Sequence, residues 1–168
     1  MKHRTKIYSR LLAPIFVSSL VPLGAMAMIT LDPAEARAEV SSATCEIHAV
    51  LAMKSGDGSI PADLDFLSAQ LRDDQFAAFK SFRLLDSKSL KLKLGQTDGA
   101  SMATGHNLKL SLLGAEASKL QLHAVLASGD KVLVDTDYKI ESSGILLIGG
   151  VRHPDGKIFF AIQCRGGS

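Results

Sequence analysis

The sequence lacks the short motifs that mark the common catalytic and nucleotide-binding sites. G-x-S-x-G and H-E-x-x-H, which carry the nucleophile or the zinc ligands in many hydrolases, are both absent. The glycine-rich stretch from Gly95 to Gly105 has neither G-x-G-x-x-G nor G-K-[ST] before a helix, so it predicts a small, polar, flexible loop and no phosphate cradle. From these absences we expect no catalytic residue of those classes and no cofactor.

An excess of positive charge is also lacking once the N-terminal residues are set aside. The whole chain holds 19 Lys+Arg and 17 Asp+Glu; residues 1–38 hold five and two of these, which leaves 14 basic and 15 acidic residues. Nucleic-acid-binding domains need a basic footprint. Lys88, Lys91 and Lys93 have no aromatic residues between them and are predicted to lie on the wet face of a strand. We therefore expect no nucleic-acid partner.

The N-terminal residues have the pattern of a secretory signal peptide. Four basic residues lie in the first ten positions, and an uncharged stretch with two prolines follows from Leu11 to Leu31. An Ala-x-Ala site at 25–27 lies directly behind the apolar run, which predicts a signal peptide at 1–27; a second site at 36–38 leaves cleavage after residue 38 as the alternative. We expect a periplasmic or secreted protein with no membrane span after cleavage.

Cysteine is scarce, and its positions are informative. Cys45 and Cys164 are the only two in the chain. An even count in an exported protein is typical of a disulfide bond. Each cysteine shares the apolar face of an extended segment, and antiparallel pairing of these two segments would bring the sulfur atoms together. The sequence predicts one disulfide-closed β domain at 45–165, preceded by a flexible N-terminal segment at 28–44.

Most of this domain alternates apolar and polar residues with a period of two, which is typical of half-buried strands. The run Ile145–Ile148 has no polar face and predicts a central strand covered on both sides. Turn signals separate the runs at 128–130, 142–144 and 153–156. We expect a mainly β protein, an antiparallel β-sandwich of about seven or eight strands with one helical segment after the first strand. The alternating runs cover residues 90–94, 108–112, 120–126 and 132–140.

The segment from Pro61 to about Phe82 has helical periodicity instead. Leu64, Leu67 and Leu71 fall on one helical face. Large apolar side chains mostly bury, so the phenylalanines of this segment fill the core if the helix covers an open end or one face of the sandwich. The alternative is a surface for an apolar ligand or a partner. The phenylalanines concerned are Phe66, Phe76, Phe79 and Phe82.

The five residues His-Ala-Val-Leu-Ala occur at 48–52 and again at 123–127. The similarity ends in a Ser-Gly-Asp turn, which indicates two strands entering similar turns and no internal repeat. His48 and His123 are predicted to point away from the inner apolar face. They are the candidates for a metal site, but such a site needs neighbouring strands and further ligands from His106 or His153. We expect two solvent-facing histidines and no metal.

Asp135-Thr136-Asp137, followed at Ile145 by I-L-L-I-G-G, resembles the half-site of a retroviral-type aspartic protease. That chemistry needs two carboxylates that share a proton, each from a D-[TS]-G loop. Here Asp137 replaces the glycine, and we assign no catalytic residue.

The stretches C-E-I-H-A-V-L-A, F-K-S-F-R-L-L and I-Q-C resemble an uncharacterised family of exported bacterial single-domain proteins. The resemblance covers most of residues 45–164. It implies a signal peptide, a leading cysteine strand, a phenylalanine-rich helical segment and a β-rich remainder, and it implies no activity.

These observations favour a non-enzymatic envelope or extracellular module that binds a protein partner or assembles at the cell surface. A compact β scaffold without recognisable chemistry is the basis of this expectation. One alternative is a carrier of a small apolar ligand held under residues 61–82. The other is a hydrolase that uses Asp135 or a histidine-bound metal.

Overall fold

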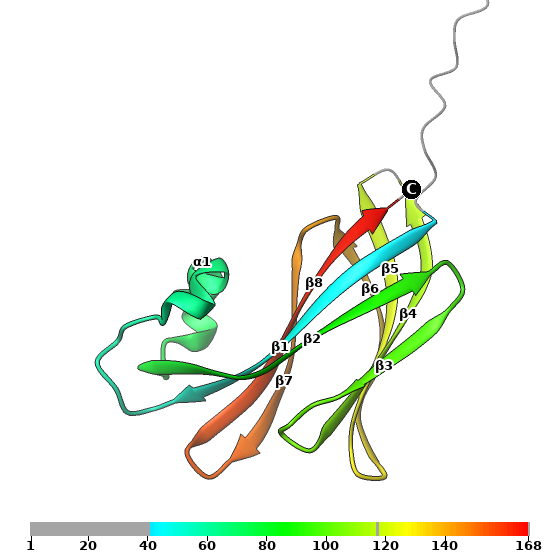
Figure 1. Cartoon of the computed structure of the whole chain (residues 1–168). Coiled ribbons are helices and arrows are strands. Elements are labelled where there is room, and N and C mark those ends of the chain that lie inside the picture. The colour runs from blue at the N-terminus through cyan, green and yellow to red at the C-terminus, as the bar shows by residue number, and fades with distance from the viewer. Residues whose placement is uncertain (1–40, 117, 168) are drawn as a thin grey trace, which may run out of the picture. The chain divides into compact units, whose positions relative to one another are not determined.

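The computed structural model describes residues 41–116 and 118–167, which form two four-stranded antiparallel sheets packed face to face (Figure 1). One sheet has the order β2-β1-β8-β7 and the other β3-β4-β5-β6. This confirms the mainly β, antiparallel sandwich, with eight strands. The strands are β1 (Ser42–Met53), β2 (Ser81–Lys93), β3 (Thr97–Ser101), β4 (His106–Glu116), β5 (Lys119–Ser128), β6 (Lys131–Glu141), β7 (Ile145–His153) and β8 (Gly156–Gly167).

The predicted signal peptide at 1–27 and the alternative cleavage site at 36–38 lie outside the described residues. β1 begins at Ser42, three residues before the position where the sequence places the start of the domain. In the described part of the chain, no helix is both long and apolar enough to cross a membrane.

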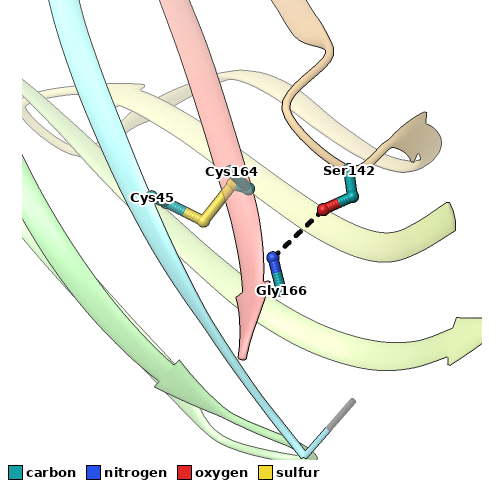
Figure 2. The surroundings of a disulfide bond; sticks show 4 residues. All are labelled: Cys45, Ser142, Cys164 and Gly166. Carbon is teal, nitrogen blue, oxygen red and sulfur yellow. Dashed lines mark hydrogen bonds between the residues drawn. A yellow bond between two sulfur atoms is a disulfide. The ribbon is translucent and has the colours of Figure 1, made fainter. Parts of the chain in front are cut away.

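The first and last strands pair antiparallel at the centre of one sheet, as the cysteine pattern predicts. Cys45 lies directly opposite Cys164, with 4.0 Å between their Cα atoms, and the two form a disulfide bond (Figure 2). Both cysteines are fully buried. At the same end of β8, the backbone N–H of Gly166 donates to Ser142 Oγ at 3.3 Å, which ties the β6–β7 turn to the last strand.

The inner faces of the two sheets form the main core. Alternate residues of each strand point inward, and the leucines of β4 and β5 meet apolar side chains of β1 and β8 there. Lys88, Lys91 and Lys93 are exposed, as predicted. The fully buried large side chains of this core are Ile47, Leu51, Leu92, Leu108, Leu110, Leu112, Leu120, Leu122, Leu126, Phe160 and Ile162.

The segment between β1 and β2 forms a second core on the outer face of the β2-β1-β8-β7 sheet. Leu64, Leu67 and Leu71 are buried as the helical pattern predicts, and they cover Val50 and Ala52 on the outer side of β1. The single helix predicted from Pro61 to about Phe82 is wrong in extent. The segment forms three short helical elements instead, and β2 already begins at Ser81. The pieces are the 3-10 helix η1 (Ala62–Leu67), α1 (Ser68–Leu71) and the 3-10 helix η2 (Asp74–Phe76).

Three further predictions need correction. β7 is an edge strand and not a central one; its outward side chains Ile145 and Leu147 are apolar because the helical segment packs against that face. The predicted flexible loop at 95–105 contains β3, which pairs with β4. Val132 was expected to share the inner face with Val134, but it is 55 % exposed. The register between β5 and β6 shifts between Leu126 and Ala127, and this bulge interrupts the inward–outward alternation of β6.

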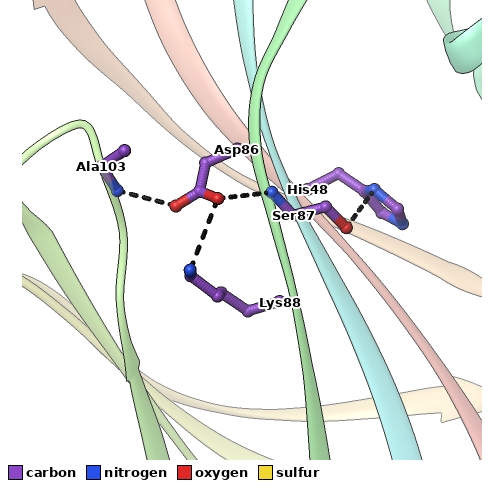
Figure 3. Close-up of polar contacts among 5 residues, drawn as sticks. All are labelled: His48, Asp86, Ser87, Lys88 and Ala103. Atoms are coloured by element: carbon purple, nitrogen blue, oxygen red, sulfur yellow. Dashed lines mark hydrogen bonds and ion pairs between the residues drawn. The ribbon is translucent and has the colours of Figure 1, made fainter.

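The two sheets are joined differently at their two sides. At the β2–β3 side, Asp86 of β2 reaches across to the loop before β4, where its Oδ2 accepts the backbone N–H of Ala103 at 2.7 Å (Figure 3). The backbone N–H of Gly95 also donates to the carbonyl of Leu112 at 2.8 Å. At the other side, the tight turn at 142–144 joins β6 to β7. Within residues 41–116 and 118–167, no ladder of hydrogen bonds pairs these two strands, so the sandwich is open along that side.

Candidate functional site

The four phenylalanines proposed as an apolar surface do not form one surface. Phe76 and Phe82 are buried in the second core, and Phe79 is half-buried beside them. Phe76 is the centre of this group, with ring-centroid distances of 6.4 Å to Phe79, 6.0 Å to Phe82 and 4.9 Å to Phe159 of β8. Phe66 lies apart, 38 % exposed, with its ring against that of His48. Most of the aromatic side chains therefore fix the helical segment to the sheet.

A groove opens where this aromatic group ends. Phe76 and Phe79 of the helical segment, Phe159 of β8, and Leu147 and Gly149 of β7 all line it. The groove has a volume of about 200 Å³. Pockets that enclose a whole small molecule usually measure about 300–1,000 Å³. The size therefore fits apolar side chains of a partner better than an enclosed ligand.

A second groove lies on the opposite face of β7, on the open side of the sandwich. Leu126, Leu133 and Val134 line it from the β5–β6 side, and its volume is about 300 Å³. Gly149 and Gly150 belong to both grooves. Strand β7 is thus hollowed on its two faces at the same position along its length.

Gly149 and Gly150 form a bulge in which the backbone of β7 is unusually accessible. The register with β8 shifts between Gly149 and Val151, and the two glycines have φ angles of 122° and 91°. Non-glycine residues rarely adopt such angles. A Cβ atom built on Gly149 would approach the Cα of Phe159 to 3.1 Å, whereas one on Gly150 meets no atom within 4 Å. The backbone at Gly150 therefore faces open space.

The edge of β7 that faces away from β8 carries unpaired backbone groups. In an antiparallel pair, every second residue directs its N–H and C=O away from its partner strand. In the part of the chain that the structure describes, β8 is the only strand paired with β7. Residues Ile145–Ile148, which precede the bulge, form the regular part of this free edge.

Two cations flank the grooves. Lys157 of β8 lines the groove beside the phenylalanines, and Arg152 of β7 lines the groove on the open side. The two residues lie directly opposite each other in the β7–β8 pair, and both are exposed. The candidate site is therefore a free strand edge with an apolar hollow on each face and positive charge beside it.

The two histidines that the sequence offers as metal candidates do not come together. His48 lies on β1 and His123 on β5, which belong to different sheets, and both point outward. Their strands are not neighbours, so the two rings cannot share a metal ion. The described residues also contain no group of three or more His, Cys, Asp or Glu side chains with the geometry of a metal site.

His48 is enclosed rather than solvent-facing. Its side chain is 14 % exposed. The ring packs against Phe66 with 4.5 Å between centroids, and Nδ1 lies 3.1 Å from Ser87 Oγ (Figure 3). Burial lowers the pKa of His48, and the Glu46 carboxylate, 4.0 Å away, offsets part of this effect. The expectation of a solvent-facing ring is wrong here because the helical segment covers the outer face of β1.

His123 lies between two aspartates on the exposed face of the other sheet. Its Nδ1 is 2.7 Å from Asp137 Oδ1, and its Nε2 is 3.3 Å from Asp135 Oδ1. Ser111 is the cross-strand neighbour of His123 on β4, but its Oγ pairs with Thr97 Oγ1 at 2.6 Å and not with the ring. A serine nucleophile needs a hydrogen bond to its base. Ser111, His123 and the aspartates are therefore the residue types of a catalytic triad, but they lack the hydrogen bond from the serine to the histidine that a triad needs.

The two remaining candidate histidines have structural contacts. His106 is buried at the start of β4, where its ring lies edge-on to Phe160 at 5.4 Å and its Nδ1 is 3.0 Å from Thr104 Oγ1. His153 ends β7, and its Nδ1 accepts the backbone N–H of Asp155 at 3.2 Å. Neither lies in a cluster with His48 or His123 that could bind a metal.

Comparison with known proteins gives no family for this chain: no family model, no curated protein and no solved structure matches it. The resemblance to an exported β-rich bacterial family therefore receives no support from these comparisons.

Proposed function

We propose that this protein is an exported, non-enzymatic binding module that takes an extended segment of a partner protein along the free edge of β7. The observation that carries the proposal is the pair of grooves on the two faces of β7 at Gly149–Gly150. Successive side chains of a strand point to opposite faces of the sheet. A segment that adds to this edge would place one side chain in each groove in turn.

Strand addition also accounts for the backbone at this site. An added strand pairs its own N–H and C=O groups with the unpaired groups of Ile145–Ile148, which gives affinity, while the grooves select side chains. Exposed strand edges are usually protected by charged side chains or by short length. The outward and inward side chains of Ile145–Ile148 are all apolar, and Gly150 has no side chain to block an approaching chain.

The predicted export agrees with the presence of a disulfide bond. A disulfide bond such as Cys45–Cys164 persists in an oxidising compartment, in agreement with export to the periplasm or the medium by the leader predicted at 1–27. An enzymatic role has weaker support, because neither Asp135 nor His123 lies in a cleft with a nucleophile bonded to its base.

Site-specific photocrosslinking tests the proposal. The photoreactive residue p-benzoylphenylalanine would replace Phe79, which lines the groove, or Phe66, which belongs to the same helical segment but lies outside the groove. The full exported chain would be illuminated in the cells that make it. We expect crosslinks to one extended partner segment from position 79 and none to that segment from position 66.

Hydrogen exchange supplies the second measurement. Binding of the crosslinked partner segment, made as a peptide, should slow amide exchange at Ile145–Ile148 and leave the β3 edge unchanged. Equal crosslinking from positions 66 and 79, no crosslink from position 79, or unchanged exchange at β7 would each refute the proposal.

A further inference from the structure

We propose that the partner segment carries an acidic side chain beside its apolar residues, and that Arg152 and Lys157 pair with it. This inference rests on the proposed function, because it specifies the chemistry of the segment that adds to β7. The inference comes from a pair of like charges, Arg152 and Lys157, which does not stabilise the fold.

Arg152 and Lys157 form a like-charge pair across two strands. They are direct partners in the β7–β8 register, one residue pair before the turn partners His153 and Gly156. Side chains directly opposite each other on an antiparallel pair have their Cβ atoms about 4.5–5.5 Å apart, and like charges in such a pair are destabilising. The folded protein therefore holds two positive charges close together at a small cost.

No anion in the described part of the chain offsets this cost. No carboxylate lies within 4.0 Å of either cation among residues 41–116 and 118–167. Asp155, in the turn between β7 and β8, instead lies 3.8 Å from His153 Nδ1. Arg152 and Lys157, at the end of β7 and the start of β8, are thus available to pair with an anionic group from outside the domain.

The two cations are also the only charged residues among those that line the grooves on either face of β7. The remaining lining is apolar apart from Gln75. A segment with apolar side chains in the hollows and a carboxylate near the bulge would match both features. Exposed ion pairs contribute modestly, so two of them should strengthen binding by about tenfold at low salt and by less at high salt.

A random dodecapeptide phage library provides the test. Selections would use the full exported chain, the Arg152→Gln/Lys157→Gln variant, and Lys91→Gln/Lys93→Gln as a matched control with two exposed lysines of the same sheet. We expect the wild type and the control to enrich peptides with alternating apolar residues and one Asp or Glu. The Arg152→Gln/Lys157→Gln variant should enrich the apolar alternation without the acid.

Charge reversal makes the test independent of any loss of stability. The Arg152→Glu/Lys157→Glu variant should enrich Lys or Arg at the position where the wild type selects an acid. For the best wild-type peptide, replacing its acid by the matching amide should weaken binding by about tenfold to the wild type and leave binding to the Gln variant unchanged.

The outcomes separate this inference from the proposed function. Apolar peptides without a preferred acid, which still slow exchange at Ile145–Ile148, would overturn the inference and leave strand addition in place. Peptides that show no apolar alternation and do not slow exchange at β7 would overturn both. Acid selection that persists in the Arg152→Gln/Lys157→Gln variant would place the anion site elsewhere and overturn the inference.

Discussion

Removing the Cys45–Cys164 disulfide should cost a large part of the stability of this domain. The two cysteines are 119 residues apart in sequence. In the chain-entropy model, a crosslink that closes a loop of this length removes about 16 cal/mol/K from the unfolded ensemble, which is about 5 kcal/mol at 25 °C. A typical domain has a free energy of unfolding of about 5–15 kcal/mol. The Cys45→Ala/Cys164→Ala variant should therefore lose at least about a third of the stability of a typical domain.

Urea unfolding at 25 °C, followed by far-UV circular dichroism, measures the effect. The midpoint should fall, and the slope m should rise, because an unfolded chain without the crosslink exposes more surface. The wild type in reducing agent is the matched control, since it keeps both buried sulfur atoms and loses only the bond. A loss below about 1 kcal/mol with an unchanged slope would refute the reasoning, because the unfolded chain would then hold β1 and β8 together without the crosslink.

Three further predictions test the second core and the junction between the sheets. Phe76→Ala should lower the free energy of unfolding by about 3–5 kcal/mol, whereas Phe66→Ala, at an exposed position, should cost about 1 kcal/mol or less; similar losses would contradict the assignment of Phe76 to the second core. Because burial holds the pKa of His48 below 6.5 in the folded protein, the contribution of His48 to the free energy of unfolding should be greatest above pH 6.5, fall as the pH drops from 6.5 to the folded-state pKa, and level off below it. His48→Gln should reduce that dependence between pH 8 and pH 5 in urea titrations, and an unchanged pH profile would be inconsistent with a buried ring. Asp86→Asn should cost about 1 kcal/mol and speed amide exchange at Ala103, whose N–H bond to the carboxylate lowers the pKa of Asp86; unchanged exchange would show that the bond does not hold the two sheets together.

The main features of the fold were predictable because they follow from local periodicity. A period of two places Leu108, Leu110 and Leu112 on one face whatever the rest of the chain does, and all three are fully buried. The cysteine pairing followed from the same alternation at the two ends of the domain. By contrast, β3 was missed because its residues, Thr97–Ser101, are small and polar, and it is a strand only because β4 lies beside it.

Strand order was harder to predict than strand identity. Ile145–Ile148 was expected at the centre of a sheet because both of its faces are apolar, but a helical segment on one face has the same effect on an edge strand. The candidate site could not be read from the sequence for a similar reason. Phe79, Gly150 and Lys157 come from three separate segments, and nothing in their local patterns indicates that they line one groove.

The position of β8 has a consequence for how the chain acquires its structure. β8 supplies Phe160 to the main core and Phe159 to the second core, and β1 has no partner on that side until β8 is present. A nascent or partly translocated chain therefore lacks the residues that complete either core until the twelve residues of β8 arrive. If residues 1–27 are the predicted signal peptide and direct passage through a membrane, such a chain stays too incompletely folded to block its own passage. Folding, crosslinking and assembly of the β7 edge are then confined to the far side, and truncated copies are left open to proteolysis.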